Sequence, residues 1–431
     1  MQKKMGFWEA VSIAVGTMIG AGIFSILGVG AQICGENLPL AFGIAALFSL
    51  SIAYSYAELG SRYVSNAGPI EFILRGIGNN PVTGTLSILM WFSYVVSISL
   101  FAKAFAGYLL ALLGVSLKSY LFTAVEVSVV VFFTVLNFFG SKAVGKSEFW
   151  IVLGKLLVLL SFVLLGVWNV NPELLKPSFS GKEIINTFYA SSVLFLTYMG
   201  FGLVTNASEN IENPKKNVPR AIYTSIAIVS IVYISVAGVA VGNLGAEGLV
   251  KAKEYALAEA SRPFLGDLGF KLVSIGALLS TSSAINATLY GGANIAYVLA
   301  KRGHLPPIFE RKVWFDEPEG LYATAVLSVL LALFLDLGGI SSLISFVFLM
   351  IYIFVIASHY RLAREVGSSR AIIAFNFAVV LCIVIVLSVY QWKEQRESFY
   401  TELVIVAFAS FFELAYRKIT GRFFKLKELQ S

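Results

Sequence analysis

Residues 16–24 of the 431-residue chain read GTMIGAGIF and lie inside the apolar segment 7–34. A segment of this length can cross a bilayer, which takes about 20 apolar residues. Three glycines within seven positions need a reason there, because glycine costs a helix interior about 1 kcal/mol relative to alanine. The stretch Gly20-Ala21-Gly22 therefore predicts either a break in a membrane-spanning helix or a place where another helix packs closely.

A counterpart lies 180 positions later, where residues 198–202 read YMGFG. Glycine-interrupted segments in matching positions of two halves point to the binding site of a transporter. Unwound backbone is tolerated at membrane depth only where it lines a cavity. The N-terminus of a half-helix offers N–H groups to a carboxylate, and freed carbonyls suit an ammonium group. The two motifs together predict a site for a zwitterion the size of an amino acid.

The composition places the chain in a membrane. It is 58% hydrophobic and 13% charged, whereas a soluble globular protein carries roughly 25% charged residues. We therefore expect an all-α polytopic membrane protein with about twelve transmembrane helices. The expected apolar segments are 7–34, 38–60, 81–111, 119–140, 147–168, 184–208, 219–243, 266–299, 321–337, 340–358, 371–390 and 399–416.

The distribution of Lys and Arg predicts the orientation in the membrane. Of 32 such residues, 21 fall in segments on the side of the N-terminus, 9 on the other side, and Lys103 and Lys155 within apolar segments. Positive residues are enriched in cytoplasmic loops. We expect a multi-pass protein of the cell membrane with both termini in the cytoplasm. This bias also accounts for the net charge of +7 without a nucleic-acid partner.

The chain resembles the amino acid–polyamine–organocation transporter superfamily. The resemblance rests on five stretches in the family's order: GTMIGAGIF (16–24), AYSYAELGSRYVSNAGP (53–69), YMGFGLVTNASENIENPKKNVPRAI (198–222), YALAEASRPFLG (255–266) and ATLYGGANIAYVLAKRGHLP (287–306). It implies a 5+5 inverted-repeat (LeuT-like) core with discontinuous helices 1 and 6. The core would span residues 1–360, with repeats at about 7–168 and 184–358. Two peripheral helices and a basic cytoplasmic tail would fill 361–431.

The resemblance also implies where an amino acid would bind. Its carboxylate would meet the N–H groups of Ala21 and Gly22, and its amino group the carbonyls of Met18, Leu196 and Met199. The implied substrate-binding set is Met18, Gly20, Ala21, Gly22, Phe195, Leu196, Tyr198, Met199, Gly200 and Phe201, with Thr17 nearby. Many relatives have glutamate where this chain has Gly202, so no role of that acid carries over. Without an acid nearby, neutral amino acids are favoured over Lys or Arg, and broad specificity is plausible.

Lys155 lies in the apolar stretch IVLGKLLVLL (151–160), where a charged side chain needs a partner or a function. We expect it about 12–14 Å from the cytoplasmic end of its helix, from nine residues at about 1.5 Å each. Sodium-coupled relatives of this fold hold a sodium ion near this depth through carbonyls of helix one and hydroxyls of helix eight. The matching hydroxyls here are those of Ser280, Ser282 and Ser283.

Lys155 is predicted to take the place of that sodium ion and to couple transport to protons. Desolvation disfavours the charged form of a lysine, so a buried lysine can release its proton during a cycle. Proton-coupled members of the family carry a lysine in this helix, which supports the prediction by resemblance. The alternative is a lysine whose ammonium group reaches the cytoplasmic interface and only stabilises the fold.

Lys103 and Glu126 are the other charges expected at membrane depth. Both lie at about 12 Å from the outer ends of adjacent apolar segments. Paired charges are the usual solution inside a membrane. We expect a structural ion pair between the two side chains, and a role for either in contacting substrate is the less favoured alternative.

The remaining reactive residues argue against an enzyme. The histidines, His304 and His359, are expected in polar loops, and Cys34 and Cys382 suggest neither a disulfide framework nor a metal site. No GxxxxGK[ST] loop for phosphate binding is present. The sequence therefore predicts a proton-coupled importer of amino acids without a cofactor. A sodium-coupled transporter or an amino acid exchanger of the same fold remains the alternative.

Overall fold

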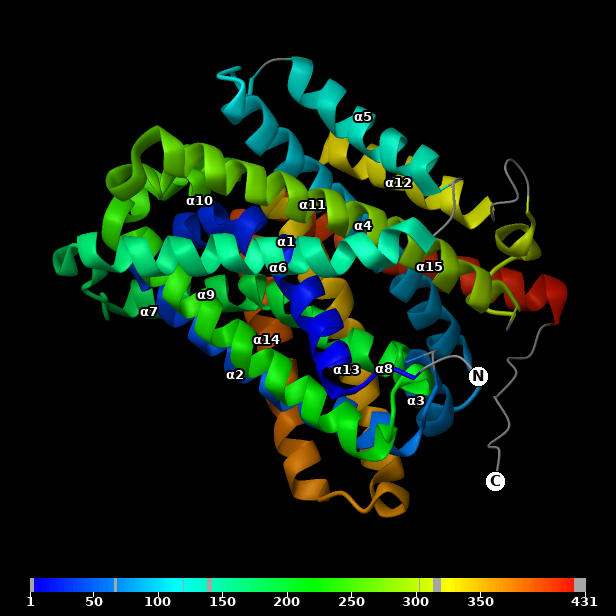
Figure 1. The fold of residues 1–431 in the computed structure, drawn as a ribbon. Coiled ribbons are helices and arrows are strands. Elements are labelled where there is room, and N and C mark those ends of the chain that lie inside the picture. Colours follow the sequence, from blue (N-terminus) through cyan, green and yellow to red (C-terminus); the bar gives the residue numbers. More distant parts are fainter. Residues whose placement is uncertain are drawn as a thin grey trace.

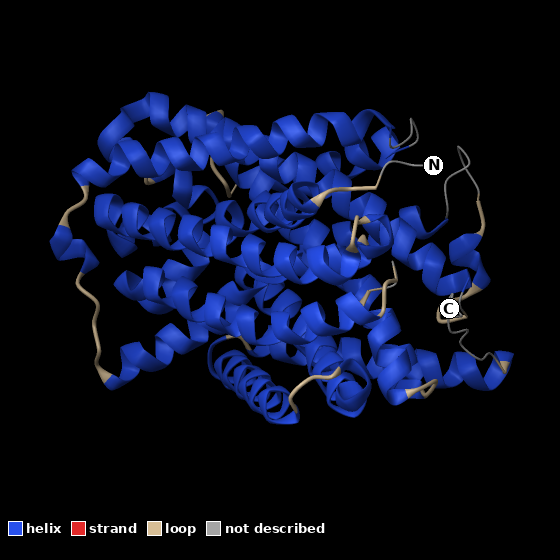
Figure 2. Cartoon of the chain, turned by 60° about the horizontal axis from the view of Figure 1, so that its bottom comes forward, coloured by secondary structure: helices blue, strands red, loops and turns tan. Residues whose placement is uncertain are grey.

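The computed structural model describes residues 4–421 except 66–67, 119, 138–141, 302 and 313–318. The described part is helical, and Figure 2 shows no strand in it. An isolated parallel bridge joins Met5 to Ile211. The predicted all-α class is confirmed for the described residues. The basic tail expected after Gly421 lies outside them.

Each expected apolar segment overlaps a helix of the structure, and most of the long helices run roughly left to right in Figure 1. The long helices are α1 (Phe7–Cys34), α2 (Leu38–Arg62), α4 (Pro81–Leu112), α5 (Tyr120–Asn137), α6 (Lys142–Gly166), α7 (Gly181–Leu194), α9 (Pro214–Ala252), α11 (Arg262–Lys301), α12 (Glu319–Phe334), α13 (Leu337–Val366), α14 (Arg370–Glu394) and α15 (Arg396–Thr420).

Short elements connect or extend these helices. They are α3 (Pro69–Ile77), α8 (Leu203–Asn206), α10 (Ala256–Glu259) and the 3₁₀ turns η1 (Gly35–Asn37), η2 (Val167–Asn169), η3 (Pro172–Leu175), η4 (Phe195–Gly202), η5 (Ser208–Asn210), η6 (Lys253–Tyr255) and η7 (Pro307–Glu310). In α9 and α11 the helix is kinked at Gly245 and Gly266, whose φ angles are 74° and 58°.

Ten helical stretches of the described chain are long and apolar enough to cross a membrane. The 16-residue α12 is shorter than the roughly 20 residues that a full span takes. The structure thus supports a multi-pass membrane protein with about ten candidate spans, and the expected count of twelve stays a prediction.

The core lies where α1, α2, α9 and η4 meet, and the periphery is apolar on its outer side. Large side chains such as Trp150 on α6 and Phe411 on α15 are exposed. Only 22–28% of the apolar stretches of α5, α6, α14 and α15 is buried, against 72% for α13. Since lipid is as apolar as a protein core, these exposed faces fit contact with the hydrocarbon of a bilayer.

The predicted break in the first helix is not observed. Helix α1 runs without interruption from Phe7 to Cys34, through Gly20-Ala21-Gly22. The expectation of a discontinuous helix 1 is wrong for this structure. Two glycines cost a helix only about 2 kcal/mol, and close packing of neighbouring helices against Gly16 and Gly22 offsets that cost.

The sixth apolar segment does change its backbone where the sequence predicts. The α-helical part, α7, ends at Leu194, and the eight residues Phe195–Gly202 form the 3₁₀ turn η4 before α8 begins. Runs of 3₁₀ helix longer than three or four residues are uncommon, and mid-helix ones mark hinges or strain. The YMGFG motif therefore lies in an irregular backbone segment between two α-helical parts.

The expectation that both histidines lie in polar loops is wrong for His359, which lies inside a helix, whereas His304 does lie in a loop, although a buried one. His359 lies in α13, is fully buried, and its Nδ1 lies 3.0 Å from Ser55 Oγ. His304 is also fully buried just beyond α11, with Nδ1 2.6 Å from Ser87 Oγ. Each serine supplies a local hydrogen-bonding partner, which makes burial of the imidazole tolerable.

Candidate functional site

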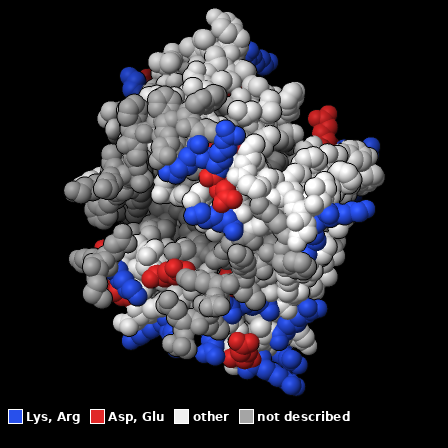
Figure 3. Space-filling view, turned by 90° about the vertical axis from the view of Figure 1, so that its right-hand side faces the viewer, with Lys and Arg blue, Asp and Glu red and all other residues white. Residues whose placement is uncertain are grey.

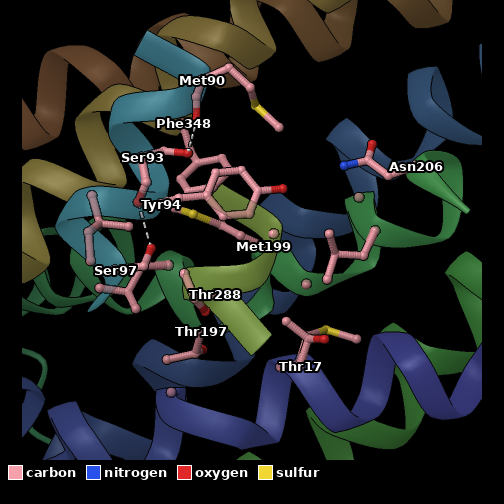
Figure 4. Close-up of a pocket in the computed structure, with 18 of the residues that line it drawn as sticks. Thr17, Met90, Ser93, Tyr94, Ser97, Thr197, Met199, Asn206, Thr288 and Phe348 are labelled. Carbon is pink, nitrogen blue, oxygen red and sulfur yellow. Dashed lines mark hydrogen bonds between the residues drawn. The ribbon is translucent and has the colours of Figure 1, made fainter. Parts of the chain in front are cut away.

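A cavity of about 200 Å³ lies between α1, η4, α4, α11 and α13. The glycine motifs of α1 and η4 form one side of it. Polar lining comes from Thr17, Ser93, Ser97, Thr197, Thr288 and Asn206, and apolar lining includes Met18, Met90, Leu196, Met199, Phe348 and Tyr352 (Figure 4). No Asp, Glu, Lys or Arg is among the described lining residues. The site is therefore uncharged, with scattered hydroxyls on apolar walls.

Six residues expected near the substrate do line the cavity. They are Thr17, Met18, Gly22, Leu196, Met199 and Gly200. They come from α1 and η4, which the sequence placed 180 residues apart, and they converge on one space.

Three expected residues lie behind the cavity wall instead. Phe195 packs edge-on against Tyr352 at 5.8 Å, and Phe201 stacks on the same ring at 6.0 Å. The hydroxyl of Tyr198 donates to the Phe42 carbonyl at 3.1 Å. All three are fully buried, because the 3₁₀ turn directs these large side chains into the core. The side chains of Gly20 and Ala21 lie outside the described part.

The carbonyls of Met18 and Ile19 in α1 receive side-chain donors from two neighbouring helices, α9 and α11. The Tyr233 hydroxyl of α9 donates to Met18 O at 2.5 Å and lies 3.3 Å from Thr197 O. Ser280 Oγ of α11 donates to Ile19 O at 3.3 Å. These side chains bind the backbone of the motif from neighbouring helices. The Met18 carbonyl, which was expected to bind the ammonium group of a substrate, therefore accepts a hydrogen bond from Tyr233 in this structure.

At two positions of the motifs, Gly22 and Gly200, a neighbouring segment comes so close that only glycine fits. A Cβ on Gly200 would lie 2.8 Å from the backbone N of Met18, and one on Gly22 would lie 2.7 Å from Thr197 Cβ. Real Cβ atoms do not approach that closely, so the backbone of η4 packs on the backbone of α1 at Gly200, and the side chain of Thr197 packs on α1 at Gly22. The packing interpretation of GTMIGAGIF is confirmed at these positions, and a role in binding an amino acid stays a prediction.

Lys155 of α6 contacts α1 at Gly16, the first glycine of the stretch GTMIGAGIF. Its Nζ donates to Gly16 O at 2.6 Å, and the side chain is 2% exposed. Ser280 and Ser283 of α11 are also buried, and Ser282 is half-buried. The lysine and Ser280 thus contact the carbonyls of Gly16 and Ile19, which lie three residues apart on α1 and beside the cavity-lining Thr17 and Met18.

Comparison with known proteins identifies the family of this chain. The family model described as amino acid permease matches residues 5–409. The chain belongs to the amino acid permease family. The permease is a transporter and not an enzyme, as the sequence predicted, and its resemblance to this superfamily is confirmed.

Relatives match along most of their length. An uncharacterized protein of Methanocaldococcus jannaschii is 55% identical over 98% of the permease and 97% of its own chain. The inner membrane transport protein YbaT of Escherichia coli is 33% identical over 91% of each chain. The branched-chain amino acid permease BcaP of Bacillus subtilis is 25% identical over 71% of the permease and 69% of its own chain.

The sequence did not reveal the contributions of α4, α11 and α13 to the cavity of the permease. Tyr94, Phe348 and Tyr352 look like any other apolar or aromatic residues of a membrane helix. Only their place in the wall of the cavity marks them, as Figure 4 shows for Tyr94 and Phe348. The motif YGG at 290–292 gave a weak signal, since glycines in a membrane helix mark close packing.

Away from the cavity, Lys103 Nζ of α4 lies 2.9 Å from Glu126 Oε1 of α5. The two side chains are 11% and 2% exposed. Removing one partner of a buried pair leaves an uncompensated charge, which costs about 3–5 kcal/mol. The pair therefore ties α4 to the otherwise lightly packed α5.

We predict that Lys103→Met and Glu126→Gln each lower the melting temperature of the purified permease, and that the double variant loses less than the two single losses combined. The reason is that the second substitution removes the charge that the first left unpaired. Thermal unfolding in detergent measures all three variants, with exposed Lys182→Met as the matched control. Additive losses would show that the pair contributes no coupling energy.

Proposed function

We propose that the permease imports neutral amino acids together with protons by alternating access. The observation that carries the proposal is the contact of buried Lys155 with the Gly16 carbonyl beside an uncharged cavity. Membership of the amino acid permease family supports amino acids as substrates.

The lining of the cavity favours a neutral side chain. An amino acid brings its own ammonium and carboxylate groups, which backbone carbonyls and N–H groups can bind. A charged substrate side chain would need a counter-charge, because an unpaired ion in an apolar site is costly. The walls of Met90, Met199, Phe348 and Tyr352 instead suit an apolar or small side chain.

Lys155 supports the proton as the coupling ion. Its ammonium group is out of water and is held by a carbonyl of the helix that lines the cavity. A movement of α1 during transport would break the contact with Gly16 O, and the lysine would then lose one interaction that stabilises its charge. Release of its proton and separation of α1 from α6 would thus be linked.

The distribution of surface charge supports import from the outer side. Figure 3 views the right-hand side of Figure 1, toward which α15 ends, and Lys and Arg side chains are spread over this face with fewer Asp and Glu among them. An excess of Lys and Arg is typical of the cytoplasmic side of a membrane protein. We infer that this face lies in the cytoplasm of the cell and that substrates leave the permease there.

Uptake into proteoliposomes tests the proposal. Radiolabelled alanine or leucine should accumulate when an inward proton gradient is imposed and sodium is absent. Accumulation that needs sodium would instead support a sodium-coupled transporter. Uptake that needs a second amino acid inside the liposomes would support an exchanger.

Competition defines the substrate class. We predict that unlabelled Ala, Leu or Phe at a saturating concentration reduces leucine uptake by more than about tenfold, whereas Lys, Arg and Glu leave it within about twofold, because an unpaired buried charge costs several kcal/mol. Strong competition by Lys would contradict a site without a counter-charge.

A further inference from the structure

Helix α15 buries a carboxyl group that the transport cavity does not use. The buried residues of α15 are Ser398, Glu402, Ala409 and Glu413, and none of them lines the cavity. Glu402 is 1% exposed. An ionisable side chain at membrane depth is costly and needs a partner or a function, so Glu402 requires an explanation of its own.

The two buried acids of α15 are satisfied in different ways. Glu413 accepts a hydrogen bond from Arg417 Nε at 2.9 Å, and a paired charge is what burial of a carboxylate requires. Glu402 bonds instead to a neutral side chain, since its Oε1 accepts from Gln391 Nε2 of α14. Its Oε2 and the Oε1 of Gln391 have no hydrogen-bond partner among the described residues, although the two side chains are 1% and 0% exposed. The pair thus has two unused acceptors and lacks one donor.

A single proton on Glu402 would satisfy both acceptors. A protonated carboxyl group has one O–H donor. From Oε2 it can donate to Gln391 Oε1, which closes a ring of two hydrogen bonds between the acid and the amide. An ionised carboxyl group has no donor to offer, so both oxygens would stay unpaired and a charge would be buried as well.

The helices that pack against α15 offer Glu402 no positive charge at membrane depth. Residues 81–102 of α4, 337–358 of α13 and 371–392 of α14 contain no Lys, Arg, His, Asp or Glu. An unpaired carboxylate there would have no counter-charge, which favours the neutral acid. The titratable side chains of these three stretches are neutral at pH 7, and they are Tyr94, Tyr352, Cys382 and Tyr390.

The charged groups near the ends of these helices are engaged or exposed. Asp336 caps α13, where its Oδ1 accepts from Gly339 N at 2.9 Å. The hydroxyl of Tyr390 accepts from Gln395 Nε2 at 3.4 Å. The charged residues around the turn between α14 and α15 are exposed, and they are Lys393, Glu394, Arg396 and Glu397.

The pair lies beside the start of a helix that lines the cavity. A Cβ on Gly339 of α13 would lie 2.8 Å from Ser398 Oγ, one turn before Glu402. Ser342 Oγ of α13 donates to Gln395 Oε1 at 2.8 Å. The turn between α14 and α15 is therefore seated on the first turns of α13, whose later turns form part of the cavity wall.

We propose that Glu402 and Gln391 form a buried proton site on the outer side of the permease, separate from Lys155. Protonated Glu402 holds the outer ends of α14 and α15 together beside α13. Loss of the proton leaves a buried carboxylate without a cation, so this clamp weakens at alkaline pH. The start of α15 lies on the outer side because its other end lies at the face that we infer to be cytoplasmic.

A hydrophobic carbodiimide tests the protonation of Glu402 in the unmodified permease, because such reagents react with protonated carboxyl groups. After treatment in detergent at neutral pH, mass spectrometry should find the adduct on Glu402 and at least about tenfold less on Glu413, whose carboxylate is paired with Arg417. Labelling of Glu402 should fall about tenfold for each pH unit above the point at which the acid loses its proton.

Thermal unfolding at two pH values tests the clamp. Glu402→Gln replaces the neutral acid by an amide that can form the same two bonds with Gln391 and cannot ionise. The two proteins should melt within about 2 °C of each other at about pH 6, and the unmodified permease at least about 3 °C below the variant at about pH 9.5. Unfolding exposes the carboxyl group to water, where it releases its proton, so a higher pH favours the unfolded chain. Every other group titrates in both proteins, so the difference isolates Glu402.

Two further variants make the result specific. Glu413→Gln is the matched control on the same face of α15. It removes the carboxylate that pairs with Arg417 and should lower the melting temperature by a similar amount at both pH values. Gln391→Leu removes the amide and should lower it already at about pH 6, because the protonated acid then loses both of its bonds.

A difference in melting temperature between the unmodified permease and Glu402→Gln that stays constant with pH would overturn the proton site. So would a Glu402 that the carbodiimide leaves unlabelled at neutral pH, or labels no more than Glu413. The labelling needs no variant to fold. Neither measurement uses a substrate or a proton gradient, so failure of the proton site would leave the proposed coupling through Lys155 untouched.

Discussion

Lys155→Ala is expected to abolish concentrative uptake of leucine. One proton moved across 100 mV supplies about 2.3 kcal/mol, which corresponds to roughly fiftyfold accumulation. Without the ammonium group on Gly16 O, the proton gradient has no site through which to act, and internal leucine should only reach the external concentration. Radiolabelled uptake under an imposed proton gradient measures this difference.

A neighbouring substitution controls for damage to the helix. A Cβ on Gly154 would have no atom within 4 Å, so Gly154→Ala should accumulate leucine like the unmodified permease. Ser280→Ala removes a weaker 3.3 Å contact to the same stretch of α1 and should reduce accumulation by only a few-fold, since one neutral hydrogen bond contributes about 0.5–1.5 kcal/mol. Proton-dependent accumulation by Lys155→Ala would rule out Lys155 as the coupling site.

Gly200→Ala should weaken amino acid binding by at least about tenfold, because overpacking costs about 1–3 kcal/mol. The new Cβ would lie 2.8 Å from the backbone N of Met18 and 3.2 Å from Ala14 O. A side chain could change its rotamer to make room, but backbone atoms cannot. The segments α1 and η4 would therefore separate, and both walls of the cavity would shift. Stabilisation of the purified permease by added amino acid measures the loss of affinity.

The same motif offers a matched control at Gly202. There the nearest atoms to a Cβ would be Tyr56 Cε1 and Cδ1, at the ordinary contact distances of 3.4 and 4.0 Å. Gly202→Ala should therefore keep its affinity for amino acids within about twofold, although the two glycines are two residues apart. Equal losses at both positions would mean that the motif tolerates no side chain for reasons other than the contact with α1.

Much of this arrangement could be predicted from the chain alone. Apolar length located the helices, and the repeat of glycines at positions 20 and 200 brought together two segments that do form one wall. Charges at membrane depth are so costly that Lys103, Glu126 and Lys155 drew attention before any coordinates, and each does contact a polar group of another helix.

Whether α1 is continuous or broken at its glycines could not be predicted from the sequence. Glycine permits both helix and break, and the choice depends on what packs against it. The donors from Tyr233, Ser280 and Lys155 come from three other helices, and no local pattern in residues 16–24 reveals them. The aromatic wall of Tyr94, Phe348 and Tyr352 was missed for a similar reason, since in a membrane helix apolar residues face lipid and cavity alike.

The most direct measurement of the central claim is proton movement with substrate in a sealed liposome. With no ion gradient imposed and with internal pH reported by a trapped dye, addition of leucine should acidify the lumen of liposomes that hold the unmodified permease. Lys155→Ala should show no acidification while Gly154→Ala behaves like the unmodified permease. Leucine uptake without acidification, or the same acidification in Lys155→Ala, would contradict the claim that this lysine carries the proton.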